Sequence, residues 1–210
     1  MTVLGLLLAM STSIFADDYQ DKWGPDLGSE IPDLDVKNTD GDEQTIEDLR
    51  GESKGILLFF ARTSNWWPYC KAQLVELQGK LEEFNDAGVA VAAVTYDSVE
   101  QNAKFKSAEN LDFSLLSDQG FNTVKNFGIL NESHKEGDFA YGVGHPGVFL
   151  IDTDNKIVLK RAEERYSNRP SMDELLEAVK EFTGEATPVE DKTEQEDWSI
   201  QSSGWISRNH

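Results

Sequence analysis

The order of apolar and polar positions in the middle of the chain predicts a strand, a helix and a second strand. Gly55–Phe60 (GILLFF) and Val89–Tyr96 (VAVAAVTY) are continuous apolar runs, which are typical of strands covered on both faces. Between them, apolar residues from Pro68 to Ala87 recur at spacings of three and four, the pattern of an amphipathic helix that Gly88 closes. This order predicts a crossover that joins two parallel strands of one sheet.

The rest of the chain predicts shorter elements around the same sheet. Ser98 with Gln101, and later Ser171 with Glu174, have the spacing of capping boxes that open helices. Further expected elements are a strand at 113–116, a helix at 121–127, a hairpin of 147–152 with 156–161, and an N-terminal hairpin at 35–46. Parallel crossovers followed by a hairpin predict an α/β fold, with a central mixed sheet flanked by helices on both faces.

Composition narrows the classes of partner and site. Hydrophobic residues make up 39% of the 210 residues, enough for a core, and 19 Lys and Arg against 39 Asp and Glu give a net charge of −20. Because such a chain repels polyanions, we expect no nucleic-acid partner. The single cysteine excludes an intramolecular disulfide framework, and His134, His145 and His210 lack a ligand spacing, so neither a metal nor a cofactor is predicted.

The two ends of the chain differ from its middle. Residues 1–16 form an uncharged apolar run that is too short for a bilayer span, which predicts a signal peptide, export and no stable membrane anchor. Residues 183–210 are polar and acidic, which predicts a disordered tail after a domain at 27–182. Trp198 and Trp205 in this tail are open to two interpretations, as stray aromatics or as side chains that dock on a partner or on the domain.

The most informative stretch is FFARTSNWWPYCKAQLVELQ at 59–78, where a buried strand leads through a short loop into a helix. Here the chain resembles the AhpC/TSA peroxiredoxin-like (redoxin) branch of the thioredoxin-fold superfamily. Close members carry Trp-Cys-Pro-Tyr-Cys where this chain has Trp66-Trp67-Pro68-Tyr69-Cys70. The resemblance continues through VTYDS at 94–98, LLSDQG at 115–120, FGILNE at 127–132, AYGVGHPGVFLID at 140–152 and NRPSMDELLEAV at 168–179. It implies a thioredoxin-like fold over about residues 27–182.

The resemblance also implies a chemical role for the start of that helix. In the family, the first cysteine of the pair is the attacking thiol, because the helix N-terminus favours its thiolate. Trp67 stands at that position, so the resemblance implies an impaired peroxidase or thiol–disulfide oxidoreductase. Ser64 matches the family's hydroxyl three residues before the thiol, whereas Phe60 stands where the family has proline.

Several residues are candidates for binding a substrate. Trp66, Pro68 and Tyr69 surround position 67 in the sequence, and His145-Pro146 stand where the resemblance places an arginine or a proline beside the site. Arg62, Arg165 and Arg169 are further candidates to steady an anion or a thiolate, and exposed, salt-linked arginines are the alternative.

Cys70 is open to two interpretations. It lies on the apolar stripe with Leu74, Leu77 and Leu81, which favours a buried structural thiol. It also lies in the first turn of the helix, next to Lys71, which favours reactivity. A single reactive thiol would need an external reductant.

Two functions therefore remain from the sequence. The first is a thiol-dependent redoxin with an antioxidant or thiol redox role, which acts on a peroxide or a protein disulfide together with an external thiol reductant. The second is a catalytically silent thioredoxin-fold protein that binds partners around Trp66, Trp67, Tyr69 and Pro146. The family resemblance favours the first function, and the Trp at position 67 favours the second.

Overall fold

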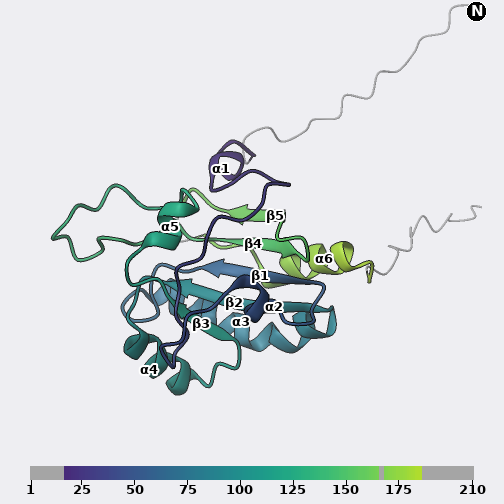
Figure 1. Ribbon diagram of the computed structural model, residues 1–210, viewed down its shortest axis with the longest axis horizontal. Coiled ribbons are helices and arrows are strands. Elements are labelled where there is room, and N and C mark those ends of the chain that lie inside the picture. Colours follow the sequence, from purple (N-terminus) through teal and green to yellow (C-terminus); the bar gives the residue numbers. More distant parts are fainter. Residues whose placement is uncertain (1–16, 166–167, 186–210) are drawn as a thin grey trace, which may run out of the picture.

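The computed structural model describes residues 17–165 and 168–185, and its centre is a five-stranded sheet in the order β3-β2-β1-β4-β5. Figure 1 shows these strands side by side across the middle of the domain. The strands are β1 (Gly55–Phe60), β2 (Val89–Thr95), β3 (Ser114–Ser117), β4 (Gly147–Asp152) and β5 (Ile157–Ala162). β2 runs parallel to β1 and β3, whereas β4 runs antiparallel to β1 and β5. The predicted mixed sheet is confirmed.

Several helices begin where the sequence has a capping box or a proline. The helices are α1 (Asp17–Lys22), α2 (Ile46–Arg50), α3 (Pro68–Asp86), α4 (Val99–Glu109), α5 (Asn122–Asn126) and α6 (Met172–Thr183). Both predicted capping boxes form, at Ser98 with Gln101 and at Ser171 with Glu174. Pro68 occupies the first turn of α3, where its missing N–H costs no hydrogen bond. The four predicted helices are therefore confirmed within one or two residues at most ends.

The sheet is covered on both faces because side chains of a strand alternate between them. On β1, Leu57 and Phe59 pack with α3 and α6 in one buried cluster. Ile56, Leu58 and Phe60 point the other way and pack with residues of α2 and α5 in a second cluster. All six residues of β1 are buried, as the continuous apolar run predicted.

The N-terminal hairpin predicted at 35–46 forms only in part. A single antiparallel bridge joins Lys37 to Glu43 around a turn. Ile46 starts α2 instead of ending a strand, because Thr45 and Asp48 form a capping box and Ile46 is buried. Neither α1 nor α2 was predicted, since each is too short to show a helical period.

The segment that precedes the predicted domain of residues 27–182 packs against the sheet. Trp23 is 4% exposed, its ring stacks on Phe149 at 4.4 Å, and it lies over Gly147, where any Cβ would collide with the indole. The buried ammonium of Lys160 donates to the carbonyls of Asp21, Trp23 and Pro25 at 2.9, 3.2 and 3.2 Å. These contacts fasten the N-terminal segment to β4 and β5.

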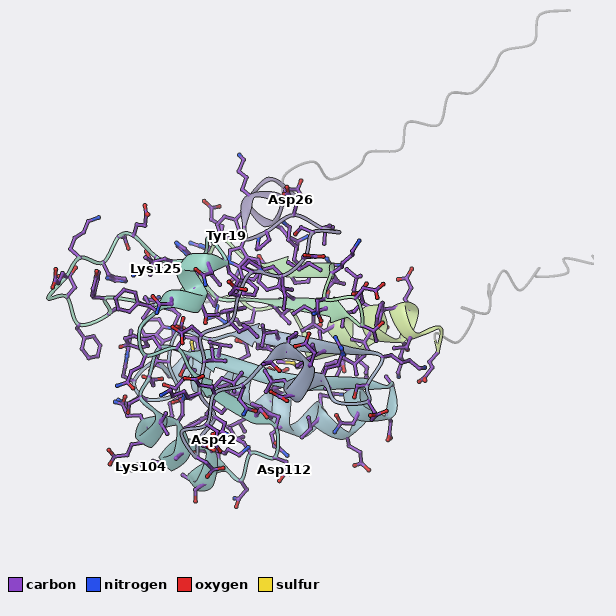
Figure 2. All side chains as sticks on the ribbon, in the orientation of Figure 1. Tyr19, Asp26, Asp42, Lys104, Asp112 and Lys125 are labelled. Atoms are coloured by element: carbon purple, nitrogen blue, oxygen red, sulfur yellow. The ribbon has the colours of Figure 1, made fainter. Side chains whose placement is uncertain are left out.

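Some predictions fall outside the described residues, namely the signal peptide at 1–16 and the tail from residue 186 onward. Within the described ranges, no helix has the length and apolar character that a bilayer crossing requires. Acidic side chains are spread over the surface, and Figure 2 labels Asp26, Asp42 and Asp112, all exposed, at separate places.

Candidate active site

A short loop at residues 61–67 joins the end of β1 to the start of α3. Both faces of β1 are buried, so the strand fixes the position at which the loop begins. At its other end Trp67 has an extended backbone, with φ −97° and ψ 111°, as a residue before proline requires. Trp67 is therefore the N-cap of α3, next to the helix N-terminus, where backbone N–H groups favour a negative charge.

The inner side of this loop rests on a buried polar network. The Thr63 hydroxyl donates to Asp97 Oδ1 at 2.8 Å, and the Ser64 backbone N–H donates to Asp97 Oδ2 at 2.6 Å. Asn102 accepts from the Thr95 hydroxyl at 2.9 Å and donates to the Leu116 carbonyl at 3.1 Å. The network ties the loop to the end of β2 and to α4, and its polar groups are satisfied within the protein.

Ser64 belongs to this network. Its side chain is 1% exposed, and its oxygen lies 3.1 Å from Asp97 Oδ2 and 2.8 Å from Asn102 Oδ1. A hydroxyl has one proton, which it shares between these two acceptors. The structure thus places the Ser64 hydroxyl beneath the loop and directs it toward the interior.

The outer side of the loop carries aromatic rings, which we call the aromatic strip: Tyr69, Trp67, Trp66 and Phe139. Neighbouring ring centroids along the strip are 5.8, 5.7 and 4.7 Å apart, in that order. Tyr69 is 51% exposed and Phe139 is 74% exposed, whereas the two indoles are half-buried. The structure thus brings the predicted residues Trp66, Trp67 and Tyr69 together, with the exposed Pro68 between them.

Arg62 lies under the two indoles. It is 7% exposed, and its guanidinium carbon lies 5.8 Å from the Trp66 ring centroid and 5.4 Å from that of Trp67. These distances are within the range of cation–π attraction. Its Nη2 also lies 3.4 Å from His134 Nε2. Arg62 therefore links the rings of the loop to the segment between α5 and β4.

The predicted residues His145 and Pro146 lie directly before β4. The backbone N–H of His145 donates to the Ile129 carbonyl at 2.7 Å. Pro146 is buried, and the peptide bond before it is trans. Burial lowers the pKa of His145 below its ordinary value of 6.5, and the nearby charges of Arg62 and His134 lower it further. Both effects favour the neutral form of the His145 imidazole.

Cys70 lies in the buried core beneath α3, in the cluster on which Trp67 of the aromatic strip also packs. Its side chain is completely buried among the core residues between α3 and the sheet. On the outer side, Arg169 Nη2 lies 3.7 Å from its Sγ, while Arg169 Nε donates to Gln73 Oε1 at 3.0 Å. Arg169 is thus the predicted arginine that reaches the thiol, and Cys70 has no exposed surface.

Sequence reasoning missed other parts of the site. Asp97 lies two residues after the end of β2. The carboxyl ends of parallel strands meet at one edge of a sheet, so its position after a buried run was a usable signal. Tyr96, which accepts from Trp66 Nε1 at 2.9 Å, has the same signal. Phe139 had none, because it lies on an irregular segment far along the chain. Among the described residues, no group of three or more His, Cys, Asp or Glu side chains is arranged to hold a metal ion.

Comparisons with known proteins identify relatives of this chain. The chain is 30% identical over 130 residues to the peroxiredoxin Bcp of Escherichia coli K12, covering 62% of this chain and 81% of that protein. It is 25% identical to the Bcp of Bacillus subtilis, covering 75% of this chain and 97% of the relative. Solved structures of peroxiredoxins also share the fold.

Peroxidoxin BcpB from Mycobacterium tuberculosis matches with a TM-score of 0.61 and 21% identity, covering 74% of this chain and 96% of that one. A peroxiredoxin-like protein from Aquifex aeolicus matches with a TM-score of 0.63 and 20% identity, covering 76% and 90%. The family model of AhpC/TSA matches residues 27–160, well over half of the chain. This protein belongs to the AhpC/TSA family and is a peroxiredoxin-like protein of the redoxin branch.

Proposed function

We propose that this protein keeps the peroxiredoxin scaffold but has little or no peroxidase turnover in the sequence given. One observation carries the proposal: Cys70, the only cysteine, is fully buried, while the N-cap position of the same helix carries Trp67. A peroxide must reach a thiolate along the axis of the new S–O bond, and indole offers no thiolate. The family's reaction therefore lacks its nucleophile at the exposed end of α3.

A cysteine at position 67 would supply that nucleophile. Its thiolate would lie at the N-terminus of α3, where the helix dipole lowers thiol pKa values. It would attack one peroxide oxygen, break the O–O bond, release water or an alcohol, and become a sulfenic acid. One thiol of an external reductant then forms a mixed disulfide and releases water, and a second thiol restores the cysteine.

Peroxide consumption with dithiothreitol as the reductant tests this proposal on the full chain. We expect the wild type to consume peroxide no faster than the reductant alone, and Trp67→Cys to exceed it by at least about tenfold. Trp67→Ala is the matched control, because it removes the same ring without adding a thiol. Loss of the half-buried indole costs about 1–3 kcal/mol of the free energy of unfolding, so each variant is checked for folding first.

Two results would contradict the proposal. Robust turnover by the wild type that disappears in Cys70→Ser would make Cys70 the working nucleophile. A folded Trp67→Cys that stays inert would show that the environment of position 67 does not support the chemistry. In that environment Phe60 stands in place of the family's proline, and His145-Pro146 stand where the family has an arginine.

We propose as a second function that the aromatic strip binds a partner. The observation in its favour is the exposure of Tyr69 and Phe139, at 51% and 74%. Large exposed apolar groups that gather in one place mark interaction sites more often than single ones do. This function does not require a reactive thiol, and it is tested by binding.

A further inference from the structure

The two indoles of the aromatic strip are held in place before any partner arrives. Trp66 Nε1 donates to the Tyr96 hydroxyl at 2.9 Å, and that hydroxyl lies 3.5 Å from the Phe139 carbonyl. Arg62 lies against both indoles from the buried side. A partner therefore loses little of its binding free energy to ordering these side chains.

The strip has the shape of a binding site for extended chain. Its rings follow one another from Tyr69 at the start of α3 to Phe139 on the segment between α5 and β4, which Figure 1 shows projecting from the sheet. An extended peptide rises about 3.3 Å per residue, so the strip can contact at most about five residues. Alternate side chains of such a peptide would face the rings.

The charges around Phe139 favour a cationic partner. The exposed residues on that segment include three acidic ones, Glu132, Glu136 and Asp138, and one basic one, Lys135. Arg62 is 7% exposed and presents almost no charge to solvent at the strip. The whole chain has a net charge of −20, which attracts cations and repels anionic partners over distances of about 10 Å at ordinary salt.

We propose that the aromatic strip binds an extended peptide segment of a partner protein in which apolar side chains alternate with lysine or arginine. This inference rests on the second proposed function and names its partner chemistry. Apolar side chains pack on the rings, and the cations lie over ring faces and near Glu136. The C-terminal tail of this chain fits less well, because residues 186–210 carry five acidic residues against two basic ones.

The test uses the full chain and an acetylated heptapeptide of alternating lysine and leucine, observed through the indole N–H signals of the protein. We expect the Trp66 and Trp67 signals to shift on titration, and the dissociation constant to rise with salt. Phe139→Ser should weaken binding at least about tenfold, and Glu136→Lys about threefold. Leu27→Ser is the matched control, because Leu27 is 58% exposed and lies elsewhere; it should leave binding unchanged.

The outcomes separate this inference from the functions above. Equal binding of a glutamate–leucine heptapeptide would overturn the cationic partner and leave the binding function standing. Binding of neither peptide would overturn both. If the indole signals of Trp198 and Trp205 shift in Phe139→Ser without peptide, the occupant of the strip is the C-terminal tail. If the wild type has the mass of a dimer and Phe139→Ser does not, the occupant is a second copy of the chain. The peroxidase proposal is decided by turnover and is unaffected.

Discussion

The loop between β1 and α3 has two sides of opposite character. On its inner side, Thr63 and Ser64 are fully buried and hydrogen-bond to Asp97, with distances of 2.6 to 3.1 Å. On its outer side, Trp66 and Trp67 join an exposed strip of rings. The inner side stabilises the loop, whereas the outer side faces whatever the protein meets. Substitutions on the two sides should therefore change different properties.

The largest expected effect is that of Asp97→Ala on stability. Asp97 is 4% exposed, and its removal leaves the Thr63 hydroxyl and the Ser64 N–H without their acceptor in the interior. We expect the free energy of unfolding to fall by about 3 kcal/mol, measured by urea denaturation. Asp42→Ala, at an exposed carboxylate, is the control and should change it by less than about 0.5 kcal/mol. A loss below about 1 kcal/mol for Asp97→Ala would contradict the network's role.

Ser64→Ala should have a smaller effect of the same kind. It removes one buried hydroxyl and leaves Asp97 with its bonds from Thr63 and from the backbone of residue 64. We expect a loss of about 1 kcal/mol in the same denaturation experiment. The adjacent Asn65→Ala alters an exposed side chain and serves as the control. If both variants had equal stability, the inner and outer sides of the loop would not differ as described.

The stability of the domain should depend on pH through His145. Its pKa in the folded protein is lowered, first by burial and then by Arg62 and His134, so the unfolded chain binds the proton more readily. The contribution of neutral His145 to the free energy of unfolding is therefore fully present above its ordinary pKa of 6.5. This contribution is lost as the pH falls through the lower pKa of the folded state. The slope for one proton is at most about 1.4 kcal/mol per pH unit.

The pH dependence is measured by urea denaturation of the wild type and of His145→Gln at about pH 7.5 and about pH 5.5. These two values bracket the range in which histidine titrates. The wild type should lose more stability than the variant on acidification. Parallel pH profiles would mean that the surroundings of His145 do not hold it neutral.

The smallest expected effect on stability is that of Phe139→Ser, on the outer side. Phe139 is 74% exposed, and its ring contacts only the edge of the strip at Trp66. We expect the free energy of unfolding to change by less than about 0.5 kcal/mol in urea. A loss as large as that of Ser64→Ala would show that the outer side also stabilises the loop.

The same contrast explains which features could be predicted from the sequence. β1 and α3 have long, regular apolar patterns, so both were predicted closely, and the two capping boxes fixed the starts of α4 and α6. The short α2 was not predicted, because five residues cannot show a helical period and the turn at Asp40-Gly41 suggested a hairpin.

Within the site, the sequence identified residues that are neighbours along the chain. Trp66, Trp67 and Tyr69 were predicted together because they lie within four positions. It did not identify Phe139 or the direction of the Ser64 hydroxyl, because these depend on how distant segments pack. The burial of Cys70 was favoured by its place on the apolar stripe, and the structure agrees.

The central claim, that the only thiol of this protein is out of reach of substrates, is tested most directly by the reactivity of Cys70 in the native full chain. Wild-type protein is treated with peroxide or with a thiol reagent, natively and in denaturant, and the modification is followed by intact mass. Because Cys70 has no exposed surface, we expect the native rate to be at least about a thousandfold lower than the denatured rate. Rapid and stoichiometric reaction of native Cys70 with peroxide would contradict the account.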